Sequence, residues 1–302
     1  MDAEALIHIG IALLLAPLFL GVVNRTKAVF AGRQGRPLLQ AYFDLAKLLR
    51  KGAVYSRTTT WVFRAGPVIG LSAVLMSLTL LPFGGQGALI SFKGDFVLFA
   101  YLLGLARFST VMAAMDVGSS FEGMGASREV TFSALAEPVL FLCFLALARH
   151  TGVFSFSEML PAISYSTWTH AGPALVLVAS ALFLVTLAEN SRIPIDDPNT
   201  HLELTMIHEV MVLDHGGPDF AFIQYGSALK LWAFSALVVG TLLPIGGIDL
   251  PTGVVLSTAG TFILAVMVGA VESTMARLRL LRVPQYMAGA AAFAVFALVI
   301  AL

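Results

Sequence analysis

Ala188-Glu-Asn-Ser-Arg-Ile-Pro-Ile-Asp-Asp-Pro-Asn-Thr-His-Leu-Glu-Leu-Thr-Met-Ile-His-Glu209 is the most polar stretch of this chain, and it directly follows an apolar run over residues 174–188. Glu189 closes that run. Asp197-Pro198 has the residue types that cap and start a helix. The stretch therefore marks the point where a membrane-spanning helix ends in a structured polar loop.

The composition places the whole chain in a membrane. Of its 302 residues, 58% are hydrophobic and 12% are charged, with a mean hydropathy of +0.88, whereas soluble proteins average roughly 25% charged residues. Cys143 is the only cysteine, which excludes an internal disulfide, a cysteine-built zinc site and a cysteine-ligated iron–sulfur cluster. Any redox centre therefore belongs to another chain.

Apolar runs of spanning length recur along the sequence, and the first is about 20 residues long. They predict an all-α integral membrane protein, one transmembrane domain over residues 1–302 with about eight transmembrane helices. Asp2 and Glu4 precede the first run while Arg25 and Lys27 follow it, the reverse of a signal peptide. The runs cover residues 5–23, 66–83, 96–115, 130–148, 173–189, 228–245, 254–271 and 284–302.

The distribution of basic residues predicts the orientation. The first loop, residues 24–64, is strongly basic, and the third, fifth and seventh loops also carry arginine, whereas the even-numbered loops hold only Lys93 and Arg149. Lysine and arginine near helix ends mark cytoplasmic loops. We therefore expect the odd loops, including an acidic fifth loop over residues 190–226, to be cytoplasmic, and both termini to be external.

The first cytoplasmic loop contains an amphipathic helix, predicted over residues 37–51 by its polar stripe. One interpretation is an interfacial helix that lies on anionic lipid. The other is a docking surface for a cytoplasmic partner. The residues of this predicted docking surface are Arg33, Arg36, Gln40, Asp44 and Lys47.

Ionisable residues at membrane depth carry the strongest functional signal, because each is costly unless it is paired, hydrated or neutralised. The sequence places Arg107, Glu129, Glu137, Glu189 and Glu272 in or at the ends of apolar runs. Buried carboxylates exchange protons near neutral pH because desolvation disfavours their charged form. The set indicates a hydrated proton path. The alternative is static ion pairing or snorkelling to the interface, especially for Glu129 and Glu272.

Two further patterns are weaker. His201, His208 and His215 recur every seven residues, which suggests metal or haem ligation, but they lie outside the apolar runs and are better interpreted as hydrogen-bonded interfacial histidines. The glycine-rich segment over residues 118–127 lacks the lysine of a phosphate-binding loop. It predicts a tight turn, with the fourth spanning helix starting at Ser127.

Four blocks of sequence carry a resemblance that covers essentially the whole chain. Together they resemble the membrane subunit that joins the two arms of complex I (NADH dehydrogenase subunit 1). They are still more similar to its relatives in membrane-bound group 4 nickel–iron hydrogenases, formate hydrogenlyase subunit 4 and the hydrogenase-4 membrane component. The blocks are Gly32-Arg-Gln-Gly-Arg-Pro-Leu-Leu-Gln-Ala-Tyr-Phe-Asp-Leu-Ala-Lys-Leu-Leu, Gly123-Met-Gly-Ala-Ser-Arg-Glu-Val with Ala136-Glu-Pro, Ala188-Glu-Asn-Ser-Arg-Ile-Pro, and Glu272-Ser-Thr-Met-Ala-Arg-Leu-Arg.

The resemblance implies a non-catalytic subunit of an oxidoreductase complex that binds no cofactor itself. A nickel–iron centre and iron–sulfur clusters are expected in partner subunits. The implied partners are an iron–sulfur small subunit and a hydrogenase-like large subunit on the cytoplasmic side, antiporter-like membrane subunits and the lipid bilayer, with no nucleic acid. The implied location is a bacterial or archaeal cytoplasmic (inner) membrane.

The resemblance also implies roles for particular residues. Glu129, Glu137, Glu189 and Glu272 match the acidic positions that begin a proton path from the redox module into the membrane, and the membrane-depth residues add Arg107 to this predicted path. A coupling interface in the fifth loop comprises Arg192, Asp196, Asp197, Glu203 and Glu209. We expect a coupling subunit of a proton- or sodium-translocating complex. The alternatives are the quinone-site subunit of a complex I-type NADH:quinone oxidoreductase, a stand-alone secondary transporter and a passive scaffold.

Overall fold

The computed structural model describes the backbone of residues 3–196 and 207–300, and the side chains from residue 6 onward within those ranges. Within these ranges, eight helices are long and apolar enough to cross a membrane. The prediction of an all-α, multi-pass membrane protein is confirmed. These helices are α1 (Ala3–Phe30), α3 (Trp61–Thr79), α4 (Asp95–Val117), α5 (Ser120–Thr151), α7 (Tyr165–Glu189), α8 (Gly217–Leu242), α9 (Leu250–Thr274) and α10 (Val283–Ile300).

Four short elements connect the long helices. α2 (Gln40–Leu49) lies between α1 and α3, and α6 (Phe156–Met159) lies between α5 and α7. Two 3₁₀ turns, η1 (Glu209–Val212) and η2 (Leu280–Arg282), precede α8 and α10.

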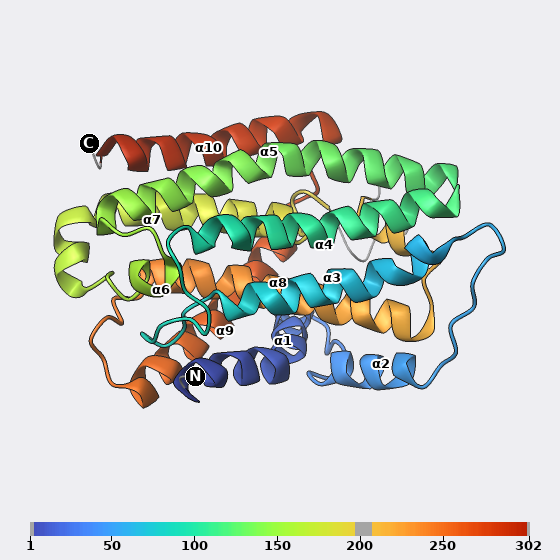
Figure 1. The fold of residues 1–302 in the computed structure, drawn as a ribbon, viewed down its shortest axis with the longest axis horizontal. Coiled ribbons are helices and arrows are strands. Elements are labelled where there is room, and N and C mark those ends of the chain that lie inside the picture. The colour runs from blue at the N-terminus through green and yellow to red at the C-terminus, as the bar shows by residue number, and fades with distance from the viewer. Residues whose placement is uncertain (1–2, 197–206, 301–302) are drawn as a thin grey trace.

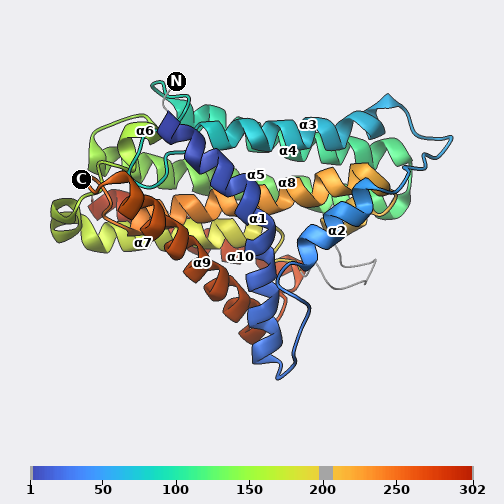
Figure 2. The same ribbon diagram turned by 90° about the horizontal axis from the view of Figure 1, so that it is seen from below.

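The long helices form a bundle with one pair that leans away. α3, α4, α5, α7, α8 and α10 run along the long axis of the molecule (Figure 1). Figure 2 shows α1 and α9 running together at an angle to the others, with α2 beside α8. The two ends of the chain lie at the same end of the bundle. We call the opposite end, where α2 lies, the basic end.

α8 is the centre of the bundle, since it contacts α1, α2, α3, α7 and α9. Leu229, Trp232 and Phe234, which point to different sides of α8, have no exposed surface. A helix that is hydrophobic all round is buried among other helices rather than amphipathic. Polar residues on α8 therefore lie inside the protein, where they can face charged side chains of neighbouring helices.

Two predicted loops are shorter than expected. α8 begins at Gly217, so the acidic loop predicted over residues 190–226 ends at Gly216. Pro218 at the first helical turn and Asp219 after it start the helix well before its apolar run. Hydropathy locates the apolar part of a helix and not its polar first turns.

The basic first loop is also shorter than the range predicted for it. α1 continues to Phe30 and α3 begins at Trp61, so the loop predicted over residues 24–64 loses residues at both ends. Within it, the amphipathic helix predicted over residues 37–51 is formed over Gln40–Leu49. The helices extend beyond the apolar runs into basic sequence.

The glycine-rich segment is helical rather than a turn. α5 begins at Ser120, and the turn before it needs only Gly118, whose φ is 74°. At Gly125, a Cβ atom would lie 2.3 Å from Cγ1 of Val210 and 2.8 Å from the carbonyl oxygen of Ile207. The glycine therefore permits close packing of the fifth loop against α5.

Candidate functional site

One guanidinium, on Arg107 of α4, holds three carboxylates. Its Nη2 lies 2.6 Å from Oε2 of Glu189, and its Nη1 lies 3.3 Å from Oε1 of Glu137. Its Nε lies 3.6 Å from Oε1 of Glu129. The planar guanidinium has five N–H donors, so it can face acids from several helices at once. Four of the residues predicted at membrane depth are therefore brought together, from α4, α5 and α7.

Lys230 of α8 is the second cation of this group, and sequence reasoning missed it. Its Nζ lies 3.0 Å from Oε2 of Glu189 and donates a hydrogen bond of 2.6 Å to the Glu189 carbonyl oxygen. The signal was a lysine within the apolar run Ala228–Ala233. We call Arg107, Glu129, Glu137, Glu189 and Lys230 the Arg107 cluster.

The charges of the Arg107 cluster do not balance. Two cations face three carboxylates, so the fully ionised cluster carries one excess negative charge. An unbalanced charge at membrane depth is costly. Uptake of one proton neutralises the cluster, and its release restores the charge.

Glu137 is the member of the cluster whose side chain is exposed on the outside of the chain. Its side chain is 44% exposed, compared with 3% for Glu189. It lies beside Gly104 of α4, where a Cβ atom would come within 3.6 Å of its Oε1. A carboxylate exposed at membrane depth requires water or another protein against it rather than lipid. The cluster therefore reaches the outer surface of the chain at Glu137, beside α4.

The end of α7 fixes Glu189 in place. Ser191 takes a positive φ of 50°, and its N–H donates to the carbonyl of Ala188 at 3.2 Å. The N–H of Arg192 donates to the carbonyl of Leu187 at 2.8 Å. This pair of bonds is a Schellman motif, which ends a helix and turns the chain back. Because the helix ends there, Glu189 stays inside the bundle while Arg192 turns into the polar loop.

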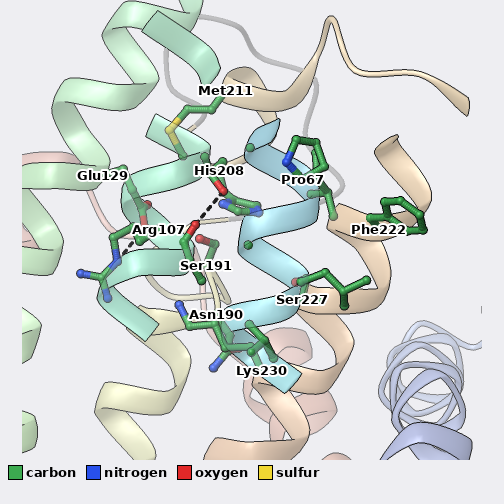
Figure 3. Close-up of a pocket in the computed structure, with 18 of the residues that line it drawn as sticks. Pro67, Arg107, Glu129, Asn190, Ser191, His208, Met211, Phe222, Ser227 and Lys230 are labelled. Carbon is green, nitrogen blue, oxygen red and sulfur yellow. Dashed lines mark hydrogen bonds and ion pairs between the residues drawn. The ribbon is translucent and has the colours of Figure 1, made fainter. Parts of the chain in front are cut away.

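An inner cavity of about 70 Å³ lies against the Arg107 cluster. A cavity of this size and polarity accommodates several water molecules. Figure 3 shows Arg107, Glu129, Ser191, His208 and Lys230 among the side chains around this cavity. The polar side chains that line it are Arg107, Thr110, Glu129, Glu189, Asn190, Ser191, His208, Ser227 and Lys230.

An outer cavity of about 280 Å³ lies between α1, α2, α8 and the fifth loop. Three residues of the predicted docking surface, Arg36, Gln40 and Asp44, line this cavity, and Nε2 of Gln40 donates to Oδ1 of Asp44 at 2.8 Å. Arg33 and Lys47 are exposed. The predicted surface is thus divided between a cavity wall and the outside of the basic end.

Glu272 lies in a different group from the other predicted acids. Its side chain has no exposed surface, and its Oε2 lies 2.7 Å from Nζ of Lys27 on α1. Its Oε1 lies 3.3 Å from Nη1 of Arg192. The three residues tie the end of α9 to α1 and to the fifth loop. We call them the Glu272 clamp.

Asp196 fastens the fifth loop at its base. Its Oδ2 accepts hydrogen bonds of 3.1 Å from the backbone N–H groups of Ile207 and His208, and its Oδ1 lies 2.9 Å from Nη2 of Arg277. Arg192 and Glu209 line the outer cavity beside it. Of the predicted coupling residues, Asp197 and Glu203 lie outside the described residues.

Replacing Glu272 by glutamine is expected to destabilise the protein. Removing one partner of a buried ion pair typically costs about 3–5 kcal/mol, because the remaining charge is left uncompensated. The Glu272→Gln variant would leave the ammonium of Lys27 and the guanidinium of Arg192 without a carboxylate. We expect a lower thermal unfolding temperature in detergent than for Glu158→Gln, which changes an exposed position in α6. Equal unfolding temperatures would refute the clamp.

Comparisons with known proteins decide the family. A family model described as NADH dehydrogenase matches residues 3–302. The chain belongs to the NADH dehydrogenase family. The resemblance carried by the four sequence blocks is therefore confirmed.

Two relatives of this NADH dehydrogenase family member occur in Escherichia coli (strain K12), and both are 30% identical to it. Formate hydrogenlyase subunit 4 aligns over 278 residues, which cover 88% of this chain and 87% of that protein. Hydrogenase-4 component C aligns over 283 residues, covering 92% and 88%.

A solved structure shows the same fold. It is the membrane-bound sulfane sulfur reductase, described as an archaeal respiratory membrane complex. One of its chains superposes with a TM-score of 0.84 and 22% identity, covering 99% of this family member and 98% of that chain. The bundle with its leaning pair of helices is therefore a fold that an archaeal respiratory complex also contains.

Proposed function

We propose that this chain anchors and couples a multisubunit, redox-driven complex that translocates protons or sodium, of the membrane-bound hydrogenase or formate hydrogenlyase type. The observation that carries the proposal is the Arg107 cluster, which has one excess carboxylate and reaches the outer surface of the chain at Glu137. The names of the two Escherichia coli relatives support the hydrogenase type.

The mechanism follows from the position of the fifth loop. Asn190 and Ser191 line both cavities directly after Glu189, so the start of the fifth loop lies against the Arg107 cluster and the outer cavity. Electron transfer in a docked module would change the charge or the position of this loop. Such a change alters the field at Glu189 and the proton occupancy of the cluster, and the proton leaves past Glu137 to a neighbouring subunit.

The proposal includes three partner subunits. The basic end, taken as cytoplasmic, would receive an iron–sulfur small subunit and a hydrogenase-like large subunit, which would hold the clusters and the nickel–iron centre. An antiporter-like membrane subunit would cover the exposed side chain of Glu137. In this account the chain itself performs no redox step, and the Glu272 clamp holds the loop against α1 and α9.

The outer cavity favours one second candidate. It combines polar groups from α2 and the fifth loop with apolar side chains such as Leu20, Phe220 and Ile223. An amphipathic cavity of this kind would suit a quinone headgroup, as expected of a complex I-type NADH:quinone oxidoreductase. Retention of activity without any quinone would remove this candidate.

Affinity purification in mild detergent tests the proposal. We expect the chain to copurify with an iron–sulfur subunit and a large subunit, together with nickel and hydrogen-dependent dye reduction. Copurification of a redox module without nickel or hydrogen activity would retain the coupling role but contradict the hydrogenase type. Recovery as a single chain that transports a solute in liposomes would contradict the proposed function altogether.

A further inference from the structure

Five of the described residues line both the inner and the outer cavity, so at these positions a single layer of side chains forms the wall between them. The inner cavity holds most of the Arg107 cluster, and the outer cavity holds Arg36, Asp44 and other polar groups of the basic end. A proton that passes from one to the other must cross this layer. The residues that line both cavities are Asn190, Ser191, His208, Ile223 and Ser227.

Only one of these five side chains has both a nitrogen that can accept a proton and a second nitrogen that can release one. Ile223 is apolar, and the amide of Asn190 does not titrate and donates to the carbonyl of Thr186 at 2.8 Å. The hydroxyls of Ser191 and Ser227 can pass on a hydrogen bond but do not hold an added proton. An imidazole can accept a proton at one nitrogen and release one from the other.

His208 is held in this wall by its own backbone. Its N–H donates to Oδ2 of Asp196, and the preceding residue, Ile207, packs on Gly125 of α5. Burial is the main cause that lowers the pKa of His208 to about 4; the positive charges of Lys230 and Arg192 lower it further, while Asp196 raises it. The ring is therefore neutral at pH 7, with one protonated nitrogen and one free to accept.

We propose that His208 is the relay that carries protons between the outer and inner cavities, an inference that rests on the proposed function. A donor in the outer cavity protonates the free ring nitrogen, and the other nitrogen releases its proton to water in the inner cavity. The ring then returns to its first tautomer. No electron moves in this step, and one proton enters for each proton that leaves.

Glu129 is the acceptor on the inner side. It lines the inner cavity, and its one ion pair with Arg107 is long, at 3.6 Å. Glu189 is held by Arg107 at 2.6 Å and by Lys230 at 3.0 Å. Among the contacts of the described residues, those of Glu129 are the weaker, which makes it the better acceptor for a proton that arrives through water in the inner cavity.

The test replaces His208 by glutamine in the assembled complex, reconstituted in liposomes. General acid–base groups typically contribute a factor of about 10²–10⁴, so we expect ion translocation to fall by roughly a hundredfold. Dye reduction by the redox module should stay within about twofold. The matched control is His215→Gln, because His215 also lies in the fifth loop but stacks on Phe63 at 3.9 Å and lines neither cavity.

Two further measurements separate the possible outcomes. A His208→Ala variant leaves space in the wall, so added imidazole should restore part of the translocation, which a purely structural role would not predict. Translocation by His208→Gln equal to that of His215→Gln would overturn the relay. In that case Glu137→Gln shows how far the failure extends. If Glu137→Gln also left translocation intact, both the relay and the proposed function would fail. If Glu137→Gln abolished translocation, only the relay would fail.

Discussion

The Arg107→Gln variant is expected to accumulate poorly and to unfold at a much lower temperature than the wild type. Three carboxylates would lose their shared guanidinium, and Glu189, 3% exposed, would keep only Lys230. Breaking one buried ion pair typically costs about 3–5 kcal/mol, a large part of the total stability of a protein. The measurement is the yield of monodisperse protein in detergent, followed by its thermal unfolding temperature.

The control for Arg107 is Arg149→Gln, which removes the same charge at an exposed position near the end of α5. A second variant, Arg107→Lys, keeps the charge but replaces the planar fork with a single ammonium. We expect Arg107→Lys to recover part of the yield, because one ammonium cannot face three acids in these positions. Equal stability of the Arg107→Gln and Arg149→Gln variants would contradict the role of Arg107 as the common partner.

The sequence predicted the number of helices and the residues at membrane depth, because both follow from hydropathy. It did not predict which charges pair. Glu272 stands at the end of an apolar run as Glu189 does, yet it pairs with Lys27 and Arg192 rather than with Arg107. Which charges pair depends on how each helix is turned about its axis and on which helices pack against it. A local sequence pattern contains neither piece of information.

Two other parts of the candidate site were missed for identifiable reasons. Lys230 lies in a run too apolar to be read as a loop, so the orientation rule did not count it. His208 was interpreted as one of three interfacial histidines, and its place between two cavities depends on contacts made by Asp196 and Gly125. The early start of α8 was missed because its first turns are polar.

Replacing Glu137 by glutamine should separate electron transfer from ion movement. The side chain is 44% exposed and its contact with Arg107 is 3.3 Å long, so the complex should assemble normally. Glutamine keeps the shape but cannot take up a proton. We expect dye reduction within about twofold of the wild type and translocation reduced by a factor of roughly a hundred, measured in liposomes that contain the complete complex.

The ratio of ions moved to electrons transferred, recorded on one preparation, tests the central claim most directly. Glu158→Gln is the control, because it removes an exposed carboxylate outside the Arg107 cluster. We predict that the ratio falls close to zero in Glu137→Gln and stays at the wild-type value in Glu158→Gln. An unchanged ratio in Glu137→Gln, with normal assembly, would contradict the claim that the Arg107 cluster couples the redox reaction to ion translocation.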